Sequence, residues 1–209
     1  MPQVSLHDLV CGVRAGDRLI SFPTDTVPAL AARPDRAELI FVAKQRSLDK
    51  PLILMASDVT ELWNYVAGTE AEQQAWREVA QRYLPGALTL VLPASDRVPP
   101  TLNPRDPASI GVRVPNHAIA QAILAQTGPL ATTSVNRSGD PPLQTMPEID
   151  QQFPDVLTLA SSEYAAFLPE TAPSPSPTPG VPSTVVRWNG QTWEVLRQGA
   201  IVLEDSWIA

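Results

Sequence analysis

The sequence has few residues able to form disulfides or zinc sites. Its 209 residues include one cysteine, Cys11, and two histidines, His7 and His117. One cysteine cannot form a disulfide within the chain, and a zinc site needs several Cys or His ligands. We therefore expect a protein of a reducing compartment, the cytoplasm, with no metal site made by its own side chains.

The chain also lacks the usual signals of membrane segments and nucleotide loops. It has no apolar run of 18 residues and no basic region followed by an apolar stretch near its start, so we expect no membrane association. Its ten glycines do not have the spacing of a dinucleotide fingerprint or a P-loop, and no Gly-x-Ser-x-Gly pattern occurs. A bound nucleotide would have to be held in another way.

Positive charge is scarce and unevenly distributed. Fifteen Lys and Arg residues stand against 22 Asp and Glu residues, which gives a formal net charge of −7. After residue 137 there are nine acidic residues but only two cations, Arg187 and Arg197. Such a chain repels a phosphate backbone, so we expect no strong direct binding to nucleic acid. A bound anion is expected in the first two thirds of the chain or at one of these two arginines.

The residues that are present suit a folded α/β protein. With 44% hydrophobic and 18% charged residues, a chain of this length can bury about two thirds of its unfolded surface. Strand patterns alternate with helix patterns, which is typical of the α/β class. No repeat or linker separates two cores, so we expect a single domain over residues 1–209.

Local patterns predict the individual elements. Helical patterns cover residues 5–16, 35–44, 57–66, 70–83 and 116–124, with Ser5, Asp35 and Asn116 as the expected N-caps. Strand patterns cover residues 18–22, 51–55, 87–92, 109–114, 130–133, 156–159, 184–188 and 192–196. We expect the first two strands and the helix between them to form a βαβ unit, and Asn189-Gly190 to form the turn of a hairpin. Residues 169–182, which include six prolines, are expected to form an exposed loop.

Both lysines of the chain lie in one short segment. Lys44 and Lys50 flank Arg46, so three cations fall within seven residues. Basic residues at a helix C-terminus complement the helix dipole, which is one ordinary interpretation. A triphosphate without a glycine cradle, however, needs point charges and a forked guanidinium, and these residues supply both. We favour phosphate and pyrophosphate binding.

Seven segments, in the same order and at similar spacing, resemble the YrdC-type threonylcarbamoyl-AMP synthase family. They are residues 22–27, 43–52, 85–90, 111–115, 134–139, 182–186 and 196–200. The resemblance implies a three-layer α/β fold with a twisted mixed sheet, helices on both sides and an open central cavity, in the short single-domain form. It also implies a nucleotidyltransferase that joins L-threonine, bicarbonate and ATP into threonylcarbamoyl-AMP and pyrophosphate, with Mg²⁺ entering on the ATP. The family hands this product to a tRNA-modifying complex.

The resemblance assigns roles to particular residues. Lys44 and Arg46 are implied as catalytic. The implied ATP-binding residues are Lys44, Arg46, Lys50, Ser109, Ser134, Asn136 and Arg197. The implied threonine-binding residues are Thr26, Arg113, Thr132 and Ser183. Taken without the family, most of these residues have ordinary interpretations as strand ends, turn caps or surface arginines.

The sequence departs from the family pattern at three positions. Pro28 and Ala29 follow Val27, where the family usually has an aromatic residue and a glycine, and Met55 stands where many members have a histidine. These changes leave a non-catalytic paralogue that binds nucleotide or RNA as the alternative function, and acidity argues against RNA. A carbamoyl-transfer enzyme on the same fold is a third possibility, since fold alone does not separate these activities.

Overall fold

One mixed sheet organises the chain. The computed structural model describes residues 3–48, 50–167 and 180–208. In these residues ten strands lie in the order β1-β8-β2-β3-β7-β4-β6-β5-β9-β10. The strands are β1 (Gln3–Val4), β2 (Ile20–Phe22), β3 (Ala29–Ala32), β4 (Ile53–Met55), β5 (Leu88–Pro93), β6 (Ser109–Arg113), β7 (Leu130–Ser134), β8 (Leu157–Leu159), β9 (Thr184–Trp188) and β10 (Trp193–Arg197).

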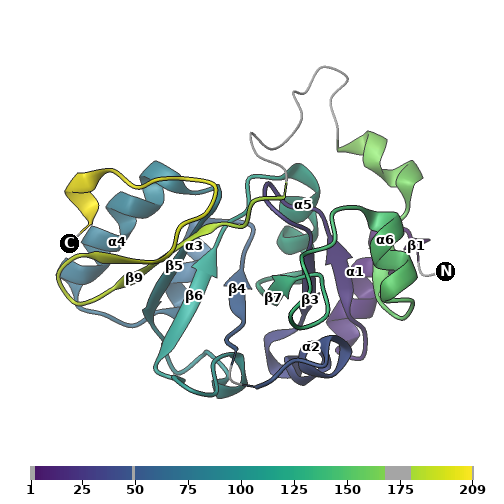
Figure 1. Cartoon of the computed structure of the whole chain (residues 1–209), viewed down its shortest axis with the longest axis horizontal. Helices are drawn as coiled ribbons and strands as arrows, with labels where there is room; N and C mark the ends of the chain where they lie inside the picture. The colour runs from purple at the N-terminus through teal and green to yellow at the C-terminus, as the bar shows by residue number, and fades with distance from the viewer. Residues whose placement is uncertain (1–2, 49, 168–179, 209) are drawn as a thin grey trace.

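Helices flank this sheet on both sides, which confirms the predicted class (Figure 1). They are α1 (Leu6–Ala15), α2 (Glu38–Lys44), α3 (Val59–Leu62), α4 (Glu70–Tyr83), α5 (Ala118–Thr127) and α6 (Met146–Gln152). The predicted caps of α1 are present, because the Ser5 side chain accepts from the Asp8 backbone N–H and Gly16 ends the helix at φ 84°. No helix in the described residues is long and apolar enough to cross a membrane.

The helices cover the two faces of the sheet unequally. Helices α1 and α5 pack against each other and form a core with Phe22, Met55 and Leu130, but with no described residue of β5, β6 or β9. The core of the opposite face contains buried side chains of α2, α3 and α4 together with Leu54 and Val112. Part of the first face is therefore left without a covering helix, over the strands that neighbour β4.

Three of the predictions about local structure are wrong. The βαβ unit is not formed as expected, because β2 pairs antiparallel with β3, a strand that the sequence analysis omitted. Helix α2 instead connects β3 to β4, and β7 lies between these two strands. Asp35 bonds to Arg33 and does not cap α2. The N-cap of α5 is His117, with no side-chain cap bond, so Asn116 does not cap that helix either.

The predicted C-terminal hairpin is confirmed. β9 and β10 pair antiparallel, Gly190 has φ 102°, and the Asn189 side chain accepts from the backbone N–H of Thr192. Trp188 and Trp193 pack edge to face at 5.3 Å, and Trp193 is fully buried. Residues 169–179 of the predicted proline-rich loop lie outside the described residues.

Candidate functional site

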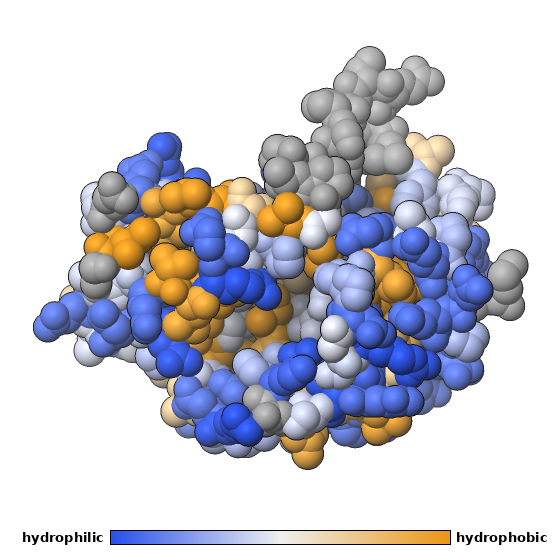
Figure 2. Space-filling view, in the orientation of Figure 1, coloured by the Kyte–Doolittle hydropathy of each residue, from blue (hydrophilic) through white to orange (hydrophobic). Residues whose placement is uncertain are grey.

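A cavity of about 550 Å³ occupies the part of the sheet face that α1 and α5 leave uncovered. Figure 2 shows a hollow in this side of the molecule, with hydrophobic side chains in its depth and both hydrophilic and hydrophobic ones around its rim. Alternate residues of neighbouring strands form its floor, because side chains two apart on a strand face the same way. These floor residues are Ile53 and Met55 of β4, Thr89 and Val91 of β5, Ser109, Gly111 and Arg113 of β6, and Thr132 and Ser134 of β7.

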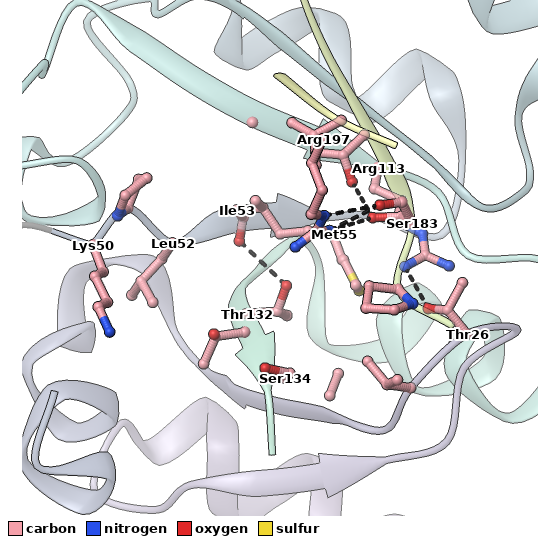
Figure 3. Close-up of a pocket in the computed structure, with 18 of the residues that line it drawn as sticks. Thr26, Lys50, Leu52, Ile53, Met55, Arg113, Thr132, Ser134, Ser183 and Arg197 are labelled. Carbon is pink, nitrogen blue, oxygen red and sulfur yellow. Dashed lines mark hydrogen bonds between the residues drawn. The ribbon is translucent and has the colours of Figure 1, made fainter. Parts of the chain in front are cut away.

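The pairing of the strands fixes the order of these residues. Met55 lies beside Arg113, and Ile53 lies beside both Gly111 and Thr132. Gly111 keeps the middle of the floor low, since a Cβ there would come within 2.8 Å of Ile53 Cγ2. Figure 3 shows Thr26 and Arg113 at one end of the cavity and Lys50 at the other. The site is thus an elongated cavity with two chemically different ends.

At the first end a buried arginine is held by three acceptors. The Arg113 guanidinium donates to Asp25 Oδ1 at 2.7 Å, to Thr26 Oγ1 at 2.9 Å and to the Gly86 carbonyl at 3.0 Å. Arg113 and Asp25 are 2% and 6% exposed, so their ion pair is shielded from water. Burial lowers the pKa of Arg113, and the Asp25 carboxylate acts in the opposite direction. Two of its five N–H groups have no hydrogen-bond partner among the described residues.

The loop between β2 and β3 holds Thr26 against this arginine. Thr24 Oγ1 donates to the Val27 carbonyl at 2.8 Å and accepts from the Thr26 backbone N–H at 3.1 Å. A threonine hydroxyl that bonds to nearby backbone in this way fixes a tight turn. The orientation of Thr26 therefore follows from the local sequence 24–27.

A second arginine lies near Arg113. Arg197 donates to the Ser183 carbonyl at 2.8 Å and to Ser183 Oγ at 3.3 Å, and Ser183 Oγ lies 2.9 Å from Thr89 Oγ1. Burial lowers the pKa of Arg197, and its charge also acts on Arg113. The family resemblance assigns Arg197 to the nucleotide and Ser183 to threonine, but the structure brings the two side chains into contact.

The other end combines cations with hydroxyl and amide groups. Lys50 Nζ donates to Ser138 Oγ at 3.1 Å, and Arg46 donates to the Pro51 carbonyl at 3.0 Å. Ser109 Oγ donates to Asp106 Oδ2 at 2.7 Å and accepts from Asn103 Nδ2 at 3.1 Å. These bonds fix the side chains at the cavity wall, where a polyanion could contact them.

Lys44 differs from the other predicted site residues because it does not line the cavity. It is completely buried at the end of α2, and its Nζ donates to the Ser134 carbonyl and, at 2.9 Å, to Asn136 Oδ1. Asn136 Oδ1 also accepts from Ser134 Oγ at 2.7 Å. Burial, followed by repulsion from Arg46 and Lys50, lowers the pKa of Lys44 to about 7. Lys44 thus supports Ser134 and Asn136 from behind.

The charge of the cavity is opposite to that of the whole chain. Its described lining includes five cations and a single carboxylate, Asp140; the cations are Arg46, Lys50, Arg113, Arg187 and Arg197. No group of three or more His, Cys, Asp or Glu side chains in the described residues could hold a metal ion. The donor set is therefore suited to anions and not to a metal bound by the protein alone.

The structure brings together ten of the eleven predicted site residues. All except Lys44 line the cavity. Pro28, Ala29 and Met55 also line it, so the departures from the family pattern lie on the cavity wall. No role was predicted from the sequence for Asp25, Thr89 or Asp140, although Asp25 and Thr89 lie within the segments that resemble the family. The ligand contacts of all these residues stay predictions.

Comparisons with known proteins agree on one family. The family model described as telomere recombination, labelled Sua5/YciO/YrdC, matches residues 13–199. A threonylcarbamoyl-AMP synthase of Chromohalobacter salexigens is 35% identical over 167 residues, which cover 78% of this chain and 87% of that protein.

Two solved structures show the same relationship in three dimensions. P. abyssi Sua5 complexed with L-threonine aligns with a TM-score of 0.75 at 28% identity, over 93% of this chain and 54% of that one. E. coli YciO aligns with a TM-score of 0.72 at 26% identity, over 93% of this chain and 88% of that one. This chain therefore spans about half of the Sua5 chain and most of the YciO chain. From the family model, the close relative and the shared fold it follows that the chain belongs to the Sua5/YciO/YrdC family.

Proposed function

We propose that this protein is a threonylcarbamoyl-AMP synthase, an enzyme of the nucleotidyltransferase class. The observation that carries the proposal is one cavity that has a buried, oriented arginine at one end and a cationic segment at the other. An amino acid and a nucleoside triphosphate bound at these ends would have their reacting groups close together above the cavity floor. The name of the C. salexigens relative and the threonine complex of P. abyssi Sua5 support the same assignment.

The first end suits the carboxylate of L-threonine. Two N–H groups of Arg113 without a described partner can form a forked pair with a carboxylate, and Thr26 and Ser183 offer hydroxyls beside it. Met55 and Ile53 supply apolar surface on the adjacent floor, where the threonine methyl group can pack. Thr132, which donates to the Ile53 carbonyl at 3.3 Å, completes this wall.

The second end suits the polyphosphate and ribose of ATP. Arg46 and Lys50 provide cations for the phosphates, and Ser109, Ser134 and Asn136 provide neutral hydrogen-bonding groups. Lys44 adds charge from behind Ser134 and Asn136. The residues present form no metal site of their own, so Mg²⁺ would enter with the phosphates and neutralise part of their charge.

The proposed reaction needs positioning and no covalent nucleophile. The threonine amine attacks the carbon of bicarbonate, a C–N bond forms and water leaves, which gives a carbamate. A carbamate oxygen then attacks the α-phosphorus of ATP, the bond to the bridging oxygen breaks and pyrophosphate departs. Arg113 and Thr26 hold the amino acid, while Arg46 and Lys50 stabilise the negative charge that develops on the phosphates.

Pyrophosphate release tests this function. Purified protein with ATP and bicarbonate should release pyrophosphate only when L-threonine is added, and much less with L-serine or without an amino acid. Mass spectrometry should identify threonylcarbamoyl-AMP as the second product. ATP binding without threonine-dependent release would instead favour a non-catalytic nucleotide-binding protein. As parts of the same proposal, the reaction takes place in the cytoplasm and the product passes to a tRNA-modifying complex.

A further inference from the structure

Asp25 is a buried charged residue beside the cavity to which no role has been given. Its carboxylate is buried beside Arg113 and accepts from Nη2 at 2.7 Å, yet it is not part of the cavity lining. A ligand in the cavity therefore meets Arg113 and not Asp25. Asp25 therefore affects ligands through its contact with Arg113 and through its charge, and not by touching them.

This ion pair distinguishes Arg113 from Arg197, the other arginine at this end of the cavity. Arg197 forms no ion pair with a described residue, and Arg187 lies farther along the sheet, beside Val91 of β5. Burial lowers the pKa of nearby His117, so this imidazole is neutral at pH 7 and adds no charge. Arg113, Arg197 and Asp25 together leave one net positive charge at this end.

One net positive charge matches one carboxylate. Two neighbouring guanidiniums, those of Arg113 and Arg197, face the cavity beside the Ser183 hydroxyl. If Asp25 carried no charge, the positive charge of both would be uncompensated. Paired arginines of this kind bind phosphate groups with parallel N–H bonds. In a cavity that also binds ATP, an uncompensated Arg113 would attract the polyphosphate of ATP instead of the carboxylate of the amino acid.

We propose that Asp25 is a positioning residue that reserves Arg113 for a carboxylate and keeps polyphosphate at the Lys50 end of the cavity. It does this by orienting the guanidinium and by cancelling one of the two positive charges at the Arg113 end. The proposal rests on the proposed function, because that function places an amino acid and a polyphosphate in one cavity. The proposal adds to that function a way in which Asp25 keeps the two anionic ligands at separate ends of the cavity.

The variant Asp25→Asn removes the charge and keeps an oxygen that can accept from Arg113. Titration calorimetry would measure the dissociation constant of L-threonine with and without saturating inorganic pyrophosphate. In the unmodified protein the two ligands occupy different ends, so pyrophosphate should change the threonine constant by less than about twofold. In Asp25→Asn, pyrophosphate should compete at Arg113 and raise the apparent constant by about tenfold or more.

Asp35→Asn is the matched control, because Asp35 pairs with Arg33 on the exposed surface and neither residue lines the cavity. In this control, pyrophosphate should change the threonine dissociation constant by less than about twofold, as in the unmodified protein. Circular dichroism would check folding, and where Asp25→Asn does not fold, Asp25→Ser removes the same charge and leaves a hydroxyl acceptor. A charge variant whose threonine binding stays insensitive to pyrophosphate would overturn the inference alone. An unmodified protein that binds no threonine would overturn the proposed function together with it.

Discussion

The expected role of Arg113 depends on the planar shape of its guanidinium as well as on its charge. Three of its N–H groups are used by Asp25, Thr26 and Gly86, and only a planar guanidinium can reach all three and still face a ligand. Arg113→Lys keeps the charge but loses this geometry. We expect the KM for L-threonine to rise roughly 30-fold or more, equivalent to about 2 kcal/mol, with a much smaller change in the KM for ATP.

Arg33→Lys is the control for this substitution. Arg33 is likewise paired with a carboxylate, that of Asp35, to which it donates two hydrogen bonds on the exposed surface. Its replacement should leave both KM values unchanged. Equal effects of Arg113→Lys on the two substrates would show that the loss is a general disturbance of the cavity.

Lys44 gives the site a dependence on pH. With a pKa of about 7, its ammonium group is charged below pH 7 and neutral above it. A neutral Lys44 no longer attracts the polyphosphate through Ser134 and Asn136. We expect kcat/KM for ATP, which reports the free enzyme, to fall as pH rises through about 7. A profile that stays flat from pH 6 to pH 9 would contradict a role for this charge.

The same titration has the opposite effect on stability. Lys44 loses its proton near pH 7 in the folded protein, but only near its ordinary pKa of 10.5 in the unfolded chain. The unfolded state thus binds more protons between these values, so stability rises with pH. Relative to Lys44→Met, the unmodified protein should gain up to about 1.4 kcal/mol per pH unit between pH 7.5 and 9 in urea unfolding.

For single residues, the sequence predicts which side chains line the cavity better than it predicts which side chains contact one another. The clustering of Lys44, Arg46 and Lys50 was visible, and two of the three line the cavity. The burial of Lys44 could not be predicted from the sequence, because it depends on how α2 packs beside the loop that follows β7. The ion pair of Asp25 with Arg113 joins residues 88 positions apart, and no local pattern reveals it.

Among the elements, α4 shows how local signals set a boundary. Thr69 and Glu72 form a capping box, in which the Thr69 side chain accepts from the Glu72 N–H and the Glu72 carboxylate accepts from the Thr69 N–H. Trp188 of β9 also donates to Glu72 at 3.2 Å, which connects the helix start to the sheet. We expect Thr69→Ala to lower the free energy of unfolding by about 1 kcal/mol in urea titrations.

Thr101→Ala provides the comparison, because Thr101 is exposed and its side chain bonds to no described residue. It should change stability by less than about 0.5 kcal/mol. Neither variant should alter threonine-dependent pyrophosphate release, since both lie outside the cavity lining. A loss of activity in Thr69→Ala without a loss of stability would connect α4 to the site in an unexpected way.

Long elements with strong caps were predictable, and short buried ones were not. The predicted bounds of α4 agree with the structure, and the hairpin of β9 and β10 forms as expected. β3 was missed because Ala29–Ala32 is a short run of three alanines and one leucine, with no strand pattern of its own, that pairs between β2 and β7. Omitting it also produced the wrong βαβ unit, because pairing order depends on contacts distant in sequence.

For the molecule as a whole, charge is separated between surface and cavity. The chain carries −7, yet five cations line the cavity. Arg187 and Arg197 are the only cations after residue 137, and both are among those five. An acidic exterior with a cationic cavity favours small anions over a nucleic-acid backbone, which would have to cross the negative surface.

This separation predicts that salt affects the two ends of the cavity differently. Raising NaCl from about 0.1 M to about 1 M shortens the screening length from about 10 Å to about 3 Å. Pyrophosphate is attracted by several partly exposed cations, so its affinity should fall about tenfold or more. L-Threonine binds beside the buried pair of Arg113 and Asp25, and its affinity should fall less than about threefold. Arg187→Gln should reduce the salt dependence for pyrophosphate, whereas Arg14→Gln, outside the cavity lining, should not. Equal salt dependence for both ligands, measured by calorimetry, would mean that the whole cavity and not one end attracts polyanions.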